Sequence, residues 1–253
     1  MRAWLVIASS ALVLTQGCIR ARAPEMNAVA RRAMLLEPDA PFWDEQAPAS
    51  YDVAVQSTAG FFVIEVTRAW APRGADRFYR LVSAGYYDDS RFTRVVPGFI
   101  AQFGVAGDSL LNALWSNRAF PDDAVKHTNA RGTIAFAMTG PNRRTTQVFI
   151  SLVDNKRLDT QGFAPFGRVI EGMNVVDRLY GGYGETSGGG VRAGKQKPLL
   201  DGGNAYADRE YPKLDVLQRA VIMTYAPVRP CFTPPTGTGC TEEPAVDAVP
   251  PPA

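Results

Sequence analysis

The sequence is poor in the residues on which most hydrolytic and metal-dependent sites are built. Its 253 residues include a single histidine, His127, and three cysteines. One imidazole leaves a serine or cysteine triad with a single possible base, and it excludes the paired histidines of a zinc motif. A glycine-rich phosphate loop and a nucleophile elbow are also missing. We therefore expect chemistry that needs neither a metal nor a cofactor.

Charge of either sign is limited as well. Lysine and arginine total 27 and aspartate and glutamate total 25, so the formal net charge is +2. The basic residues are scattered, and Arg143 and Arg144, on a turn-rich loop, are expected to face solvent. This balance argues against nucleic acid as a partner. With 46% hydrophobic and 21% charged residues, the composition is typical of a soluble globular protein, which we expect to be a monomer.

The N-terminus is predicted to be a targeting segment over residues 1–17. Its apolar run, AWLVIASSALVLT, is too short to span a bilayer. The stretch LTQGC, which ends at Cys18, resembles the lipobox of bacterial lipoproteins, although Thr15 and Gln16 depart from the usual residues. This resemblance implies a lipid anchor on Cys18 and a location at the periplasmic face of the cell envelope. Cleavage after Ala23, which would give a secreted form, and an uncleaved anchor are the alternatives, and all three export the chain.

The other two cysteines, Cys231 and Cys240, lie in a proline-rich tail over residues 226–253. They bracket the turn-rich stretch FTPPTGTG, and an oxidising compartment favours a disulfide between them. Two free thiols are the alternative. The tail has little means of burying a core. A second poorly periodic segment, residues 18–49, is predicted to be a linker or extension with one short helix in MNAVARRAMLL.

Residues 50–225 contain the periodic segments of one predicted domain. One helix is expected from Pro72 to just before Gly85, and a second over residues 172–181. A glycine-rich stretch, residues 181–204, is expected to be mobile. Eight further runs alternate or are β-branched, which favours a mainly β fold, an antiparallel barrel with helices at its ends. These expected strands are residues 51–56, 61–67, 90–96, 98–104, 131–138, 147–153, 166–170 and 213–223.

The run FTRVVPGFIAQFG, residues 92–104, places two polar side chains among apolar ones. Arg94 and Gln102 are separated by an even number of positions, so a strand period of two puts them on one face. Pro97-Gly98 interrupts the run, which makes the alignment approximate. Two strand ends with polar edges are the structural explanation, and a polar pair beside an apolar site is the functional one.

The same run resembles the signature of cyclophilins, the cyclophilin-type peptidyl-prolyl cis-trans isomerases. Two further blocks follow in the family's order, GTIAFAMTGPNRRTTQVFIS over residues 132–151 and GFAPFGRVIEGMNVVDRL over residues 162–179. The resemblance covers residues 51–225. It implies the family's fold, a closed eight-stranded antiparallel β-barrel capped by two α-helices, and this agrees with the periodic segments counted above.

The resemblance also implies the positions of an active groove. Arg94 stands where the family has its catalytic arginine, and Gln102 where it has a glutamine. Arg157 stands where many eukaryotic members have tryptophan, and Phe163 lies near their histidine position. These departures put cyclosporin binding in doubt but leave Arg94 untouched. The residues expected to bind the substrate are Phe99, Ile100, Ala137, Phe149, Leu158 and Phe163.

The sequence thus predicts a peptidyl-prolyl cis-trans isomerase that assists the folding of exported proteins. Its partners would be proline-containing polypeptides that are unfolded or flexible. Rotation about a peptide bond needs no nucleophile and no metal, which suits a chain with one histidine. The alternative is a cyclophilin-like module that grips proline segments without useful turnover, because Arg157 and Phe163 alter the pocket wall.

Overall fold

An antiparallel sheet organises the fold. The computed structural model of the chain describes residues 27–188 and 196–223, which all lie in one unit, Ala21–Thr224. The strands are β1 (Ser50–Ser57), β2 (Gly60–Thr67), β3 (Ser90–Arg91), β4 (Arg94–Val96), β5 (Ile100–Phe103), β6 (Thr133–Phe136), β7 (Val148–Ser151), β8 (Pro165–Glu171) and β9 (Val216–Met223). Across the sheet they follow the order β3-β9-β1-β2-β8-β6-β7-β5-β4.

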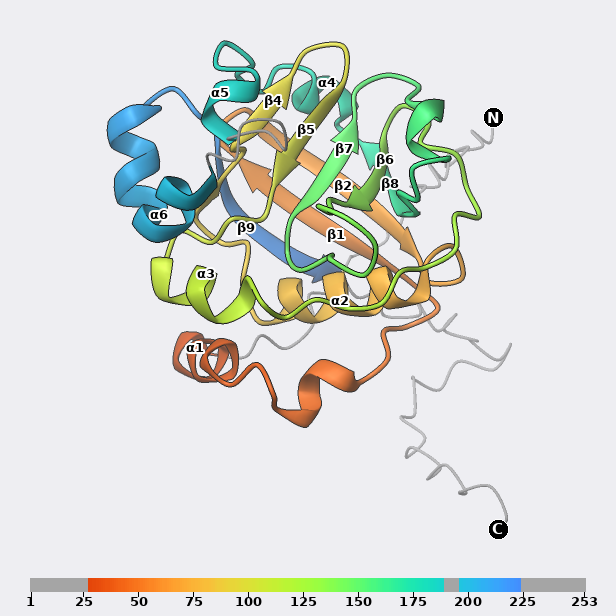
Figure 1. Cartoon of the computed structure of the whole chain (residues 1–253), viewed down its shortest axis with the longest axis horizontal. Coiled ribbons are helices and arrows are strands. Elements are labelled where there is room, and N and C mark those ends of the chain that lie inside the picture. Colours follow the sequence, from red (N-terminus) through yellow and green to blue (C-terminus); the bar gives the residue numbers. More distant parts are fainter. Residues whose placement is uncertain (1–26, 189–195, 224–253) are drawn as a thin grey trace, which may run out of the picture. The chain divides into compact units, whose positions relative to one another are not determined.

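The two edge strands of this sheet are neighbours in the chain. Only Phe92 and Thr93 separate β3 from β4, so the sheet curls round on itself (Figure 1). The predicted mainly β, antiparallel fold is confirmed, with nine strands where eight were expected. The expected strand over residues 90–96 is divided, because its first part pairs with β9, as far as the Phe92 amide that donates to the carbonyl of Asp215 at 3.0 Å, whereas residues 94–96 pair with β5. Among the described residues no ladder joins β3 to β4, and the chain itself connects these edges.

A tight turn joins β4 to β5. The amide of Phe99 donates to the carbonyl of Val96 at 2.9 Å, with Pro97 and Gly98 at the central positions. Proline holds φ near about −65° at the first of them. Gly98, with φ of 72°, supplies the left-handed conformation that a type II turn requires at the second. The turn therefore fixes the register between the two strands.

Helices flank the sheet. The expected helix α2 begins at Pro72 and buries Ala75, Phe78 and Leu81 against β8 and β9, as its helical spacing predicts. The expected helix over residues 172–181 is much shorter, α4 (Met173–Val176). After it, the amides of Arg178 and Leu179 bond the carbonyls three residues back in tight turns, and the amide of Tyr180 donates to the carboxylate of Asp215 at 2.7 Å. In the described residues the α-helices are α1 (Ala28–Leu36), α2 (Pro72–Ser83), α3 (Ser109–Trp115), α4 (Met173–Val176), α5 (Glu185–Gly188) and α6 (Gln196–Glu210), and two short 3-10 helices span Pro41–Asp44 and Lys156–Leu158.

The glycine-rich stretch over residues 181–204 contains helical structure where it is described. Helix α5 lies beside β4, and α6 begins at Gln196 (Figure 1). The backbone of α6 is kinked at Gly203, whose φ of 51° and ψ of −142° lie outside the helical region. A side chain there would clash with the carbonyl oxygen of Gly107, which instead accepts the amide of Asn204 at 2.9 Å. The kink thus allows α6 to dock against the chain that leads into α3.

The segment before β1 packs onto the domain. Leu35 and Trp43 are buried in the main core, and the indole N–H of Trp115 donates to the carbonyl of Leu35 at 3.0 Å. The rings of Trp43 and Trp115 meet edge to face, with their centroids 4.3 Å apart. The predicted short helix is confirmed as α1, and part of the segment predicted as a linker is thereby packed against the barrel.

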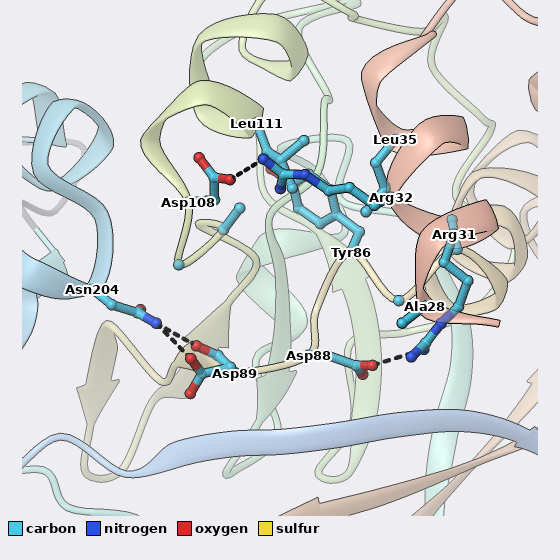
Figure 2. Close-up of a pocket in the computed structure, with 14 residues that line it drawn as sticks. Ala28, Arg31, Arg32, Leu35, Tyr86, Asp88, Asp89, Asp108, Leu111 and Asn204 are labelled. Atoms are coloured by element: carbon cyan, nitrogen blue, oxygen red, sulfur yellow. Dashed lines mark hydrogen bonds and ion pairs between the residues drawn. The ribbon is translucent and has the colours of Figure 1, made fainter.

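Two ion pairs fix the polar face of α1 (Figure 2). Arg31 pairs with Asp88 at 2.9 Å, and Arg32 pairs with Asp108 at 2.5 Å. These side chains line a cavity of about 410 Å³ between α1 and the segments that follow α2 and precede α3. Burial raises the pKa of the Asp88 carboxyl, although the amide of Ala220 and the guanidinium of Arg31 oppose the shift. Helix α1 is therefore held by apolar contacts on one side and by charge on the other.

Several predictions concern parts of the chain for which no structure is described. Cys18, Cys231 and Cys240 lie outside the described residues, as do the targeting segment over residues 1–17 and the tail over residues 226–253. The lipid anchor and the disulfide therefore stay predictions. In the described part of the chain, no helix is long and apolar enough to cross a membrane.

If α1 is part of the folded domain, shortening Leu35 must weaken the whole fold. We expect Leu35→Ala to lower the free energy of unfolding by about 2–4 kcal/mol, as for other buried leucines. Leu36→Ala is the matched control, because Leu36 is 39% exposed and Leu35 only 5%, and its effect should stay below about 1 kcal/mol. Urea unfolding followed by circular dichroism measures both, and equally small effects would show that α1 does not contribute to stability.

Candidate active site

Four residues on adjacent strands form one row across the sheet. Arg94 on β4 lies opposite Gln102 on β5, and Gln102 lies opposite Phe149 on β7. Phe149 in turn lies opposite Ala135 on β6. Directly opposite residues in antiparallel strands share a face, so a guanidinium, a carboxamide and an aromatic ring stand side by side. The expectation that Arg94 and Gln102 share a face is confirmed, across a hairpin rather than along one strand.

A small apolar cluster, separate from the main core, lies beside this row. Its buried members are Ile100, Ala135, Phe149 and Leu158, and Phe99, Ala137 and Phe163 pack against it. All of the apolar substrate-binding residues predicted from the sequence therefore come together. They line a cavity of about 510 Å³ that also borders Arg94 and Gln102, and the remaining lining residues are Val96, Met138, Arg157, Gln161 and Glu185.

Arg94 is held by polar partners on both sides. Its side chain is 11% exposed, and its Nη1 donates to Oε1 of Gln102 at 3.1 Å. Nε and Nη2 donate to the two carboxylate oxygens of Glu185 at 2.8 and 2.7 Å. Gln102 extends this hydrogen-bond network. Its Nε2 donates to Oε1 of Gln147 at 2.8 Å, and Nε2 of Gln147 donates to Oε1 of Gln196 at 3.1 Å. The guanidinium is thus anchored to α5 directly and to the start of α6 through two glutamines.

Hydrogen bonds fix the loop that carries Leu158 and Phe163. The buried amide of Asn129 donates from Nδ2 to the carbonyl of Phe163 at 2.8 Å and to the carboxylate of Asp159 at 2.7 Å. Thr128 donates its hydroxyl to the same carboxylate at 2.6 Å. Partial burial raises the pKa of the Asp159 carboxyl, but the bonds from Thr128 and Asn129 outweigh it and leave the pKa below its ordinary value.

Arg144 contradicts the expectation that it faces solvent. Its side chain is 3% exposed, and it pairs with the carboxylate of Asp122 and donates to the carbonyl of Gly162. Burial lowers the pKa of the guanidinium. Arg144 therefore connects the loop at Gly162, beside Phe163, to the segment that carries Asp122. Arg143, in contrast, is exposed as expected.

The two departures from the family pattern lie in the wall of the cavity. The guanidinium carbon of Arg157 sits 4.6 Å from the centroid of the Phe99 ring, within the range of a cation–π contact. The Phe163 ring meets the Phe149 ring edge to face, with centroids 5.5 Å apart. Both residues therefore supply flat surface to the pocket.

Two residues of the hydrogen-bond network around Arg94 and Gln102 were not predicted. Gln147 had a usable signal, because it lies two positions before Phe149 in the same strand pattern and so faces the same way. Glu185 had none, since it belongs to a glycine-rich stretch without periodicity, and only the tertiary fold brings it to Arg94. In the part of the chain that the structure describes, no three His, Cys, Asp or Glu side chains are grouped as they would be to hold a metal ion.

Comparison with known proteins identifies similar sequences over this domain. A model of the family "Cyclophilin type peptidyl-prolyl cis-trans isomerase/CLD" matches residues 51–199. Peptidyl-prolyl cis-trans isomerase-like 1 of Aspergillus niger is 34% identical over 134 residues, which are 51% of this chain and 80% of that protein. Peptidyl-prolyl cis-trans isomerase CYP18-2 of Arabidopsis thaliana is also 34% identical over 134 residues, with 51% of this chain and 79% of that protein covered.

A solved structure agrees with the fold. The crystal structure of a Cryptosporidium parvum cyclophilin type peptidyl-prolyl cis-trans isomerase aligns with a TM-score of 0.52 and 19% sequence identity. The alignment covers 69% of this chain and 98% of that one. At this identity the similarity concerns the fold, and it includes nearly the whole of the other chain.

The bonds of Asp159 predict how the pocket loop depends on pH. Because the folded-state pKa of Asp159 is lowered, its contribution to stability is present above the unfolded pKa of about 3.9 and is lost as the pH falls through the folded value. We expect Asp159→Asn to lower the free energy of unfolding by about 1 kcal/mol at neutral pH, with the difference from the parent shrinking below about pH 4.

Chemical unfolding of both chains at a series of pH values measures this difference. Asp201→Asn is the control, since the carboxylate of Asp201 is exposed and pairs with Lys197 on its own helix at 2.5 Å. A difference for Asp159→Asn that stays constant into acid would show that its ionised form does not hold the loop.

Proposed function

Since the chain belongs to the cyclophilin-type peptidyl-prolyl cis-trans isomerases, we propose that the groove around Arg94 catalyses rotation about X-Pro bonds in exported proteins. The observation that supports it most is the row of Arg94, Gln102 and Phe149 across three adjacent strands. It places a cation with several donors against an apolar pocket large enough for a proline ring. Arg94 and Gln102 are the proposed catalytic residues.

Rotation about an X-Pro bond requires no covalent step from the protein. Rotation about an X-Pro bond destroys amide resonance and faces a barrier of about 20 kcal/mol, so the uncatalysed step takes tens of seconds or longer. No bond breaks, and a catalyst needs only to favour the twisted amide over both planar forms. Neither a nucleophile nor a metal is required, which accounts for a chain with one histidine.

Arg94 is suited to bind the twisted amide. As resonance is lost, the proline nitrogen becomes pyramidal and gains a lone pair, so a donor aimed at it bonds the transition state and hardly the ground state. A guanidinium stays protonated and offers rigidly placed donors. The second N–H of the Gln102 amide remains to hold the carbonyl that precedes the proline. Together these donors would act where the low dielectric of the pocket strengthens them.

The apolar cluster would hold the proline ring while the rest of the substrate turns. Phe149, Leu158 and Phe163 offer a floor and walls, and burial contributes about 25 cal/mol per Å² of apolar area removed from water. A barrier lowered by about 7 kcal/mol corresponds to roughly 10⁵-fold acceleration. Ring anchoring, one well-aimed donor and desolvation are together sufficient for an effect of that size.

Removing the guanidinium tests the proposal directly. We expect Arg94→Ala to lower kcat/KM by about 10²- to 10³-fold, as for the loss of one preorganised transition-state donor, without loss of the folded state. Two-dimensional NMR exchange on a short Ala-Pro peptide measures the rate with the full-length chain in mild detergent. Arg168→Ala is the matched control, because Arg168 is an exposed arginine in an ion pair with Glu65, outside the cavity.

The same experiment separates the enzyme from the non-catalytic alternative. A parent chain that binds the peptide but leaves its exchange rate unchanged would be a proline-binding module. An Arg94→Ala variant that accelerates exchange as much as the parent does would show that catalysis does not depend on Arg94.

We further propose that the chain is exported and anchored by a lipid on Cys18. The support is the sequence alone: a short apolar leader, the stretch LTQGC, and a cysteine pair in the tail that suits an oxidising compartment. The isomerase would then act on proline-containing chains that fold at the periplasmic face of the envelope.

Replacing the anchor cysteine tests this location. We expect the full chain, expressed in a Gram-negative host, to partition into the detergent phase, and Cys18→Ser to move it into the soluble or uncleaved fraction. Cys231→Ser is the control and should leave the partitioning unchanged. The lipid anchor on Cys18 would be excluded if the parent chain stayed in the aqueous phase. It would also be excluded if the Cys18→Ser chain partitioned into the detergent phase as the parent does.

A further inference from the structure

The second partner of Arg94 is a carboxylate outside the sheet. Glu185, the first residue of α5, takes the Nε and Nη2 edge of the guanidinium with both oxygens, at 2.8 and 2.7 Å. This two-point geometry fixes the plane of the guanidinium as well as its distance. Glu185 also lines the cavity that holds the apolar cluster. The carboxylate therefore lies within reach of the groove while it contacts the residue proposed to do the chemistry.

Helix α5 is itself tied to the strand that carries Arg94. The hydroxyl of Ser187, which is buried, donates to the carbonyl of Thr93 at 2.7 Å. The phenol of Tyr211, the residue directly after α6, donates to the carbonyl of Thr186 at 3.3 Å. Because Thr93 directly precedes Arg94 in the chain, the bond from Ser187 holds α5, and with it the Glu185 carboxylate, next to the backbone that carries the guanidinium. This bond helps to fix the distance between the carboxylate and the guanidinium.

A count of donors shows that this ion pair leaves the site usable. Arginine has five N–H groups; Glu185 takes one on Nε and one on Nη2, and Gln102 takes one on Nη1. Within the described residues, one N–H on each Nη remains for a substrate. In the same part of the chain Gln102 also keeps one N–H without a partner, since the other is given to Gln147. A bound peptide can therefore be held without displacing the carboxylate.

The nature of the reaction decides what the carboxylate does. Peptide-bond rotation creates a lone pair on nitrogen but no net charge, so the direction of a donor matters more than the net charge of the site. An arginine side chain keeps its charge in proteins with or without a partner. The Glu185 side chain is 53% exposed, and water weakens its field at the groove. Its main effect is then on the orientation of the guanidinium.

We propose that Glu185 is a positioning residue, which aims the free N–H groups of Arg94 at the proline nitrogen. This inference rests on the proposed function and assigns a further residue to the same reaction. The opposite role would be a carboxylate that competes with the substrate for Arg94. The two roles predict opposite effects when the carboxylate is removed, because a lost guide slows the reaction and a lost competitor speeds it.

A graded series of variants distinguishes these roles. Glutamine keeps one acceptor oxygen and alanine none, so a positioning role gives activity in the order Glu185, Glu185→Gln, Glu185→Ala. We expect kcat to fall about threefold for Glu185→Gln and about tenfold for Glu185→Ala, with KM within about twofold of the parent. NMR exchange at several peptide concentrations, with the full-length chain, separates kcat from KM. Unchanged values, or a rise in kcat/KM from Glu to Ala, would overturn the inference.

A second measurement does not depend on activity. With ¹⁵N-labelled arginine, the Nε–H signal of Arg94, assigned from its absence in Arg94→Ala, should be protected from solvent exchange in the parent and exchange faster in Glu185→Ala. Glu65→Gln is the matched control, since it removes the carboxylate of an ion pair at 3.1 Å outside the cavity, and it should change neither kcat nor this signal. Unaltered Arg94 protection in Glu185→Ala would also overturn the inference.

The Arg94→Ala chain keeps this test separate from that of the proposed function. If Arg94→Ala is inactive while the Glu185 variants match the parent, the function stands and the positioning role fails. If the parent does not accelerate exchange, the proposed function fails and the positioning role fails with it.

Discussion

The need to pair one largely buried guanidinium, that of Arg94, governs the arrangement of the site. Arg94 is only 11% exposed and lies beside an apolar cluster, where an unpaired charge would be costly. A carboxylate from Glu185 and a carboxamide from Gln102 meet that demand. Since Gln102 in turn needs partners, the network extends through Gln147 to Gln196. The polar half of the groove is thus one connected system, whose members depend on each other for their orientation.

The sheet supplies the geometry that this network needs. Antiparallel register places Arg94, Gln102 and Phe149 directly opposite one another, and the type II turn at Gly98 fixes that register at one end. The main core fills the interior of the curled sheet, whereas the pocket residues form a second, smaller cluster. The row can therefore present its side chains to a groove without interrupting the packing that stabilises the barrel.

Strand periodicity and the ordered blocks were enough to predict the sheet, Arg94, Gln102 and the apolar pocket. The sheet follows from alternation over short stretches of chain, which can be read locally, whereas Arg94, Gln102 and the pocket residues were assigned from the resemblance of the ordered blocks to the cyclophilin family. Glu185, buried Arg144 and the docking of Leu35 could not be predicted in this way. Each depends on a contact between distant segments, and two of them lie in stretches rich in glycine or in turns. The division of one expected strand into β3 and β4 likewise depends on tertiary pairing, because β3 pairs with β9 and β4 with β5.

The departure at Arg157 changes charge more than shape. Its guanidinium is flat and lies 4.6 Å from the Phe99 ring centroid, while the guanidinium of Arg94 lies 5.5 Å from the same ring. Both distances lie within the range of a cation–π contact, and each such contact is favourable because the face of the ring carries negative charge density. Arg94 is held on its other edge by Glu185 at 2.7 Å, and this ion pair fixes the orientation of its guanidinium beside Phe99. The carboxylate thereby keeps the guanidinium proposed to act on the substrate in a fixed orientation beside a cationic wall, and the flat surface that would hold a proline ring is retained.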